Sequence, residues 1–133
     1  MKSTAWMIMV ATMLVLTPGP AAAAESDRTL LGQYVSSFQS GSQPLRAVFT
    51  PTGDDQWDVV FYFKFHGKKH EYEGTAEGSL DGGALRGTVQ NENKRRTFSF
   101  QGNFRDGEFR GTHAEIKRTG ERRTGSLTMS EET

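Results

Sequence analysis

From Leu45 onward, apolar and polar residues alternate along the chain, and turn-forming residues interrupt the alternation about every 10 to 14 positions. One such stretch, residues 57–65, places its apolar residues on a single face: Trp57, Val59, Phe61, Phe63 and Phe65. A period of two, rich in aromatic and β-branched residues, is typical of half-buried strands. The pattern predicts eight strands, at about 31–38, 44–50, 56–65, 69–80, 84–92, 96–105, 108–117 and 122–129. The first of them, an apolar stretch ahead of the regular alternation, could instead hold a helical turn.

Glycines recur on the face of these strands that is predicted to point inward: Gly74, Gly78, Gly87, Gly102, Gly111 and Gly125. Glycine lets a strand bend toward the face on which it lies. Eight strands that curl in this way are enough to close around side chains or one small ligand. The sequence therefore predicts an all-β fold, a small antiparallel meander β-barrel of about eight strands. A β-sandwich with the same hairpins is the alternative.

The pair Asp106-Gly107 predicts a two-residue hairpin turn, and the turn fixes which residues face each other. Counting outward from it sets Phe100 opposite His113 on the inner face. The next inward pair is Phe98 and Glu115.

A turn at Gly67-Lys68 is predicted for the hairpin that precedes it. This turn sets Phe63 opposite Tyr72 on the inner face. On the outer face it sets Lys64 opposite Glu71, where opposite charges favour the pairing.

The chain contains an internal echo at a spacing of 24 residues: GSLDGGALRGTV (78–89) aligns without a gap on GNFRDGEFRGTH (102–113). We interpret it as one hairpin pattern used twice, with Gly82-Gly83 in the place of Asp106-Gly107. His113 then occupies the position that Val89 fills in the first copy. A histidine is thus predicted to point inward among phenylalanines.

Two ionisable groups on the inner face, His113 and Glu115, are costly to bury unless they are paired or hydrated. They could bond to each other or to Tyr72 near the mouth of the barrel, or they could orient a bound molecule, or they could act as a catalytic pair. A β-bulge could also turn Ile116 inward and Glu115 out. The predicted ligand-binding residues are His113, Glu115, Tyr72, Phe98 and Phe100.

The sequence offers little for catalysis or metal binding. It has no cysteine, which excludes disulfides and thiol chemistry. No serine nucleophile is predicted beside His113 and Glu115, since Ser99 falls on the outer face. Of the three histidines, His66 falls on the face opposite His70, so too few ligands converge for a zinc site. No enzyme activity, metal or cofactor is predicted.

Charge is balanced overall, with 16 Lys and Arg against 16 Asp and Glu, but it is unevenly distributed. Residues 86–123 carry 10 basic and 5 acidic side chains, and residues 25–85 carry 5 and 9. A basic outer face could bind an acidic partner or a polyanionic envelope polymer. No nucleic-acid-binding motif is present, so nucleic acid is not an expected partner. The candidate surface residues are Arg95, Arg96, Arg118, Arg122 and Arg123.

The N-terminus has the layout of a secretory signal peptide: Lys2, an apolar run over residues 5–16, and small residues up to Ala24. Twelve apolar residues are too few for the roughly 20 that a spanning helix needs. We expect cleavage near Ala24, which leaves residues 25–133 as a single secreted or periplasmic domain without a transmembrane segment.

The leading hypothesis is an exported, non-enzymatic barrel that binds a small, largely apolar molecule in its interior. The alternative is an interaction module with a filled core that works through its basic outer face. Replacing His113 by valine separates them: binding should weaken in the first case, and stability should be unchanged or higher in the second. The identity of the ligand and the oligomeric state are left open by the sequence.

Overall fold

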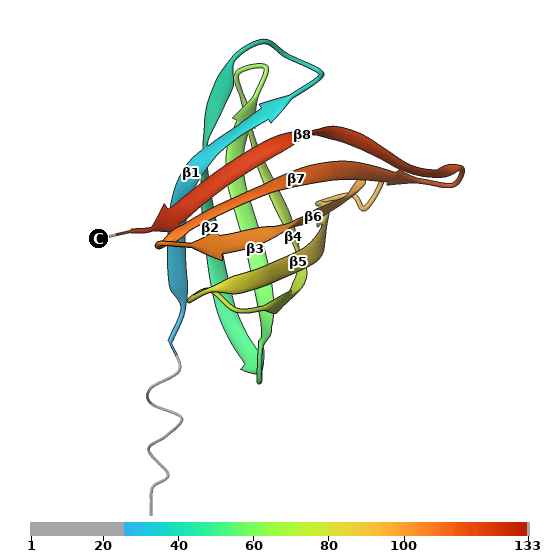
Figure 1. Cartoon of the computed structure of the whole chain (residues 1–133). Helices are drawn as coiled ribbons and strands as arrows, with labels where there is room; N and C mark the ends of the chain where they lie inside the picture. Colours follow the sequence, from blue (N-terminus) through green and yellow to red (C-terminus); the bar gives the residue numbers. More distant parts are fainter. Residues whose placement is uncertain (1–25, 133) are drawn as a thin grey trace, which may run out of the picture.

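The computed structural model describes residues 26–132 and forms a closed barrel of antiparallel strands, each hydrogen-bonded to its neighbours in the sequence (Figure 1). Pairing of the first strand with the last closes the sheet. The all-β antiparallel meander barrel is thus confirmed over the β-sandwich. The predicted signal peptide, residues 1–24, lies outside the described residues. The strands are β1 (Arg28–Ser36), β2 (Ser42–Gly53), β3 (Gln56–Phe65), β4 (Lys68–Gly78), β5 (Gly83–Asn91), β6 (Thr97–Arg105), β7 (Glu108–Lys117) and β8 (Gly120–Glu131).

The first strand is confirmed as a strand, and it begins earlier and ends earlier than the sequence predicts. It ends at Ser36, whose hydroxyl accepts a hydrogen bond from the backbone N–H of Phe38 at 3.1 Å. Such a side-chain bond offers the backbone an alternative to the sheet ladder and favours a turn.

In the part of the chain that the structure describes, no helix is long and apolar enough to cross a membrane.

The β6–β7 hairpin has the predicted register. Asp106 and Gly107 both have positive φ, 54° and 80°, as a type I′ turn requires. Phe100 lies opposite His113, and Phe98 lies opposite Glu115.

The β3–β4 hairpin turns one residue earlier than predicted, at His66 (φ 51°) and Gly67 (φ 80°). Glycine adopts positive φ without strain, and the second turn position here belongs to Gly67 rather than to a lysine. As a result Phe63 faces His70 instead of Tyr72, and Lys64 faces a second lysine. The predicted pairing was wrong by two residues, a shift that leaves every side chain on its predicted face.

The echo holds for the inward positions but not for the turn. Gly78 pairs with Leu85 rather than with Gly87, so β4 and β5 are joined by the loop 79–82 and not by a turn at Gly82-Gly83. Within that loop Leu80 is only 4% exposed and belongs to the hydrophobic core. Its counterpart in the second copy, Phe104, is buried as well but lies within strand β6, so the two copies differ in the length of the turn and not in the burial of this position.

One half of the barrel is filled by side chains. Leu30, Phe49, Phe109 and Met129 are almost completely buried there. The ring of Phe109 covers two glycines, since a Cβ atom at Gly102 or Gly111 would lie 2.7 Å from it. Inward glycines in this half therefore make room for aromatic rings. We call this the closed end. It carries the connections 54–55, 79–82 and 106–107.

The opposite half carries the connections 37–41, 66–67, 92–96 and 118–119. Aromatic residues become more exposed toward this end: Phe61 and Phe100 are buried, whereas Phe63 and Phe98 are partly exposed. We call it the open end. The β7–β8 hairpin extends beyond the other strands there (Figure 1).

Candidate functional site

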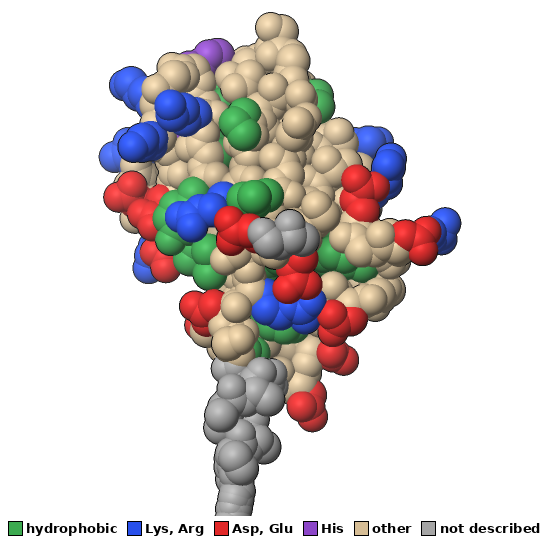
Figure 2. Space-filling model, turned by 90° about the vertical axis from the view of Figure 1, so that its left-hand side faces the viewer, with side chains coloured by type: hydrophobic (Ala, Val, Ile, Leu, Met, Phe, Trp, Pro, Cys, Tyr) green, Lys and Arg blue, Asp and Glu red, His purple; other side chains and the backbone are tan. Residues whose placement is uncertain are grey.

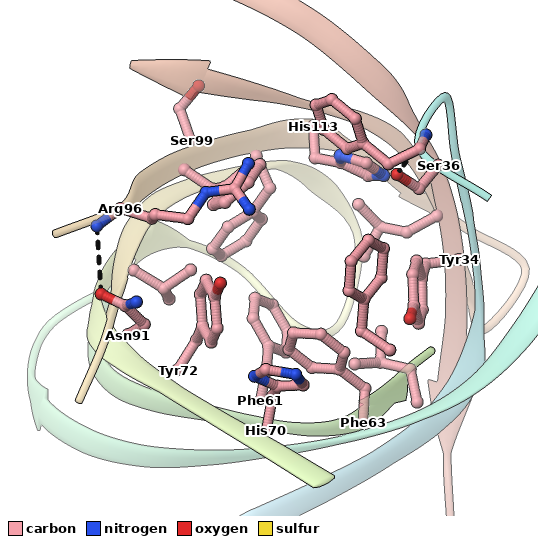
Figure 3. A pocket seen from close by; sticks show the side chains of 17 residues that line it. Tyr34, Ser36, Phe61, Phe63, His70, Tyr72, Asn91, Arg96, Ser99 and His113 are labelled. Carbon is pink, nitrogen blue, oxygen red and sulfur yellow. Dashed lines mark hydrogen bonds between the residues drawn. The ribbon is translucent and has the colours of Figure 1, made fainter. Parts of the chain in front are cut away.

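A cavity of about 190 Å³ lies inside the open half of the barrel (Figure 3). Its inner part is formed by buried apolar side chains: Leu45, Phe61, Val89, Phe100 and Leu127. Toward the open end its lining is aromatic and partly exposed: Phe38, Phe63, Phe65, His70 and Phe98. An apolar cavity with a few polar groups near its mouth has the general character of a small-molecule site.

The structure brings together four of the five predicted ligand-binding residues on the cavity wall: Tyr72, Phe98, Phe100 and His113. The fifth, Glu115, is 6% exposed and points inward at the rim, where it bonds to Arg96 and not to the cavity. A bulge does occur between β7 and β8, next to His113, with Thr124 as the extra residue. It does not reverse the faces, because Ile116 remains exposed at 38%.

His113 is hydrogen-bonded through both ring nitrogens. Nε2 lies 2.9 Å from the carbonyl oxygen of Val35, which can only accept, so Nε2 carries the proton. Nδ1 then accepts from the hydroxyl of Thr124 at 2.6 Å. Burial lowers the pKa of His113, and the nearby charge of Arg123 lowers it further, while the bond to Val35 acts the other way. The ring is therefore neutral at pH 7.

These bonds place His113 where the barrel closes. Its ring links β7 to the bulged Thr124 of β8 and to the end of β1, a residue 78 positions away in the sequence. An apolar residue at this position would leave the 1%-exposed Thr124 hydroxyl without its nitrogen partner. These hydrogen bonds to β8 and β1 explain why a histidine stands where an apolar residue is expected. Toward the cavity, this neutral ring presents carbon atoms.

Glu115 is paired with Arg96 in a two-bond contact, with Nε at 3.0 Å and Nη2 at 3.2 Å from its carboxylate oxygens. These bonds lower the pKa of Glu115, an effect that burial opposes. Arg96 was predicted on the outer face, and the structure places it on the wall of the cavity. Its guanidinium lies 5.5 Å and 5.4 Å from the ring centres of Phe38 and Phe98. The backbone N–H of Arg96 donates to Asn91 and holds the loop in place (Figure 3).

The Tyr72 hydroxyl is a polar group on the cavity wall without a side-chain hydrogen-bond partner among the described residues. Tyr72 is 7% exposed and lines the cavity, and it makes no side-chain hydrogen bond to another described residue. Burial raises the pKa of Tyr72, so the phenol stays protonated and able to donate. Figure 3 shows the hydroxyl on the side of the cavity where Arg96 lies. A buried, unbonded donor in an apolar cavity is a position where a ligand can bond.

Tyr34 also lines the cavity, and the sequence analysis did not select it. Its hydroxyl donates to the carbonyl of Lys64 and accepts from Gln39 at 3.2 Å. The signal was present, because Tyr34 lies on the inner face of the first predicted strand, in the weakest part of the alternation. Tyr34 is therefore a structural counterpart of Tyr72 whose hydroxyl is already satisfied.

The remaining predicted surface residues are exposed and lie around the open end: Arg95, Arg118, Arg122 and Arg123. Arg122 is placed opposite Glu115 in the β7–β8 pairing, and its guanidinium lies 5.9 Å from the ring centre of Phe38. Phe38 thus contacts both Arg122 and Arg96 at the mouth of the cavity.

The two residues that the sequence offered as a catalytic pair, His113 and Glu115, are not paired with each other in the structure. His113 and Glu115 bond to different partners and not to each other, so no base is oriented by a carboxylate. Ser99 bonds to Glu121 on the outside, and its hydroxyl points away from the cavity in Figure 3. Over residues 26–132, no three side chains of histidine, cysteine, aspartate or glutamate converge in a way that could hold a metal ion.

Comparison with known proteins finds no family model that matches the chain and no curated protein that matches it.

Proposed function

We propose that this protein is an exported, non-enzymatic β-barrel that binds a small, largely apolar molecule inside its open half. The observation that carries the proposal is the apolar cavity with the Tyr72 hydroxyl on its wall, which makes no side-chain hydrogen bond within residues 26–132. Phe98 and Phe100 contact the apolar body of the ligand, and Tyr72 donates a hydrogen bond to it. His113 contributes a carbon edge, while Glu115 acts indirectly by holding Arg96 at the mouth.

The size of the cavity limits the ligand. A dry apolar cavity of about 150 Å³ is known to accept benzene. The cavity of about 190 Å³ therefore accommodates one aromatic ring or a short alkyl chain, with the remainder of the molecule toward the mouth. Edge-to-face contacts already present, such as Phe61 with Phe100 at 5.1 Å, show the geometry in which a further ring can pack.

Native mass spectrometry of protein purified from the exported fraction tests the proposal directly. An extra mass that denaturation releases would support a ligand and begin to identify it. Recovery in the exported fraction, with a chain mass that starts at residue 25, tests cleavage near Ala24. A bare chain that stays bare with a panel of short apolar compounds would contradict the proposal. The search would then turn to the basic side chains outside the cavity.

Replacing Tyr72 by phenylalanine is expected to weaken ligand binding about fivefold, since a hydrogen bond is worth about 1 kcal/mol. Stability should stay the same or rise, because the hydroxyl has no partner among the described residues. Tyr34→Phe is the matched control, since it removes a hydroxyl that is bonded to Lys64 and Gln39. It should lower stability and leave affinity nearly unchanged. Titration calorimetry and urea denaturation measure both quantities. The reverse pattern would assign the ligand's polar contact to Tyr34.

A further inference from the structure

Charge is separated along the axis of the barrel. The four connections at the open end, with two flanking residues on each side, carry eight basic and two acidic side chains: Lys64, Lys68, Lys69, Lys94, Arg95, Arg96, Lys117 and Arg118 against Glu92 and Glu121. The three connections at the closed end, with their flanks and residues 26–29 and 130–132, carry nine acidic and two basic side chains. Figure 2 shows acidic side chains gathered where the described chain begins and basic ones toward the opposite end.

The same imbalance holds at the mouth itself. Glu115 is the carboxylate there, and Arg96, Lys117 and Arg122 surround it. Arg96 uses Nε and Nη2 for Glu115, so other N–H groups of its five donors are still available. The guanidinium of Arg122 lies against Phe38. Three cations around this one carboxylate leave a net positive charge beside the mouth of the apolar cavity.

We infer that the ligand is an amphipathic carboxylate, with an apolar body in the cavity and its carboxylate at the mouth beside Arg122 and Arg96. This inference rests on the proposed function and names its ligand class. A carboxylate can accept bonds from those N–H groups of the two guanidiniums that no described side chain uses, and from the Tyr72 hydroxyl. The positive charge at the mouth of the cavity also raises the local concentration of anions and repels cations. A neutral ligand could use the apolar wall and the Tyr72 hydroxyl, but it would leave the cations at the mouth without a role.

Two pairs of compounds test the inference: octanoate with 1-octanol, and 3-phenylpropanoate with 3-phenylpropan-1-ol. Each pair shares its apolar body and differs in the charge of the head group. Calorimetry on protein expressed from the full sequence should give at least about tenfold tighter binding of the carboxylates at low salt. The preference should shrink at about 0.5 M salt, because exposed charges are screened.

Arg122→Gln should lower carboxylate affinity about fivefold and leave alcohol affinity unchanged. Arg105→Gln is the control, since it makes the same charge change on an exposed side chain at the closed end. It should affect neither compound.

The outcomes separate the inference from the proposal beneath it. If no compound of either pair binds, the cavity is not a site for such molecules and the proposed function fails. If the alcohols bind as tightly as the carboxylates, the proposed function stands and the carboxylate assignment is overturned. Equal losses in the two arginine variants would also overturn it, because overall charge rather than the mouth would then set the preference.

Discussion

Replacing Gly125 by alanine is expected to lower the free energy of unfolding by at least about 3 kcal/mol, a large fraction of the 5–15 kcal/mol typical of a domain. Gly125 lies in β8, where β8 meets β1 and closes the barrel. A Cβ atom there would lie 1.8 Å from the carbonyl oxygen of Val35 and 2.8 Å from Nε2 of His113. The first of these atoms belongs to the backbone, so the clash can be relieved only by separating the two strands.

Urea denaturation followed by circular dichroism measures the effect, and Gly82→Ala is the control. Gly82 lies in the loop 79–82, where a Cβ atom would meet nothing within 4 Å. That change should be neutral or slightly stabilising, because alanine restricts the unfolded chain. If Gly125→Ala were as mild as Gly82→Ala, the close approach of β1 and β8 in this structure would be wrong. The closure of the barrel would then need another explanation.

The sequence predicts the barrel because the information that specifies it is local. A period of two decides which residues face inward, and a single Asp106-Gly107 turn sets the β6–β7 register. The inward position of His113 follows from that register alone. The turn at His66 was missed because positive φ is uncommon at any residue other than glycine, so Gly67 drew the predicted turn one residue too far along the chain.

The candidate site was predicted only in part, because its polar contacts are long-range. Arg96 reaches Glu115 across 19 residues, and His113 reaches Val35 across 78. Alternation placed Glu115 on the inner face but could not say which cation would pair with it. Arg96 follows a turn, where no periodicity indicates a side. The separation of charge between the two ends was also invisible along the chain, since each end is assembled from connections far apart in the sequence.

Replacing His113 by valine is expected to destabilise the protein by about 2 kcal/mol at pH 7.5. Valine matches the first copy of the repeated pattern, and the sequence alone predicted a neutral or stabilising change for a filled core. The structure reverses this expectation, because the ring supplies a hydrogen bond to the Val35 carbonyl and accepts one from Thr124. A hydrogen bond contributes about 0.5–1.5 kcal/mol, so the loss of both costs about 1–3 kcal/mol. The single proton of the Thr124 hydroxyl, which the wild type donates to Nδ1, then has the carbonyl oxygen of residue 113 as its acceptor, at the longer distance of 3.2 Å.

The pH dependence of this difference identifies its cause. Burial keeps the pKa of His113 below its ordinary value near 6.5. Just below pH 6.5, therefore, the histidine is protonated in the unfolded chain but still neutral in the folded one. Wild-type stability should therefore fall as the pH drops through about 6.5, until the lower pKa of the folded state is passed. Glu115 does not contribute in this range, because its pKa is lowered and its ion pair with Arg96 persists to more acidic pH. His113→Val has no such group, so its deficit should be smaller at pH 5.5 than at pH 7.5. If the loss of stability were the same at both pH values, the histidine would stabilise the contact between β7, β8 and β1 by its shape alone. If there were no loss at either pH, the simpler prediction would be restored, in which any residue that fits the core serves at this position.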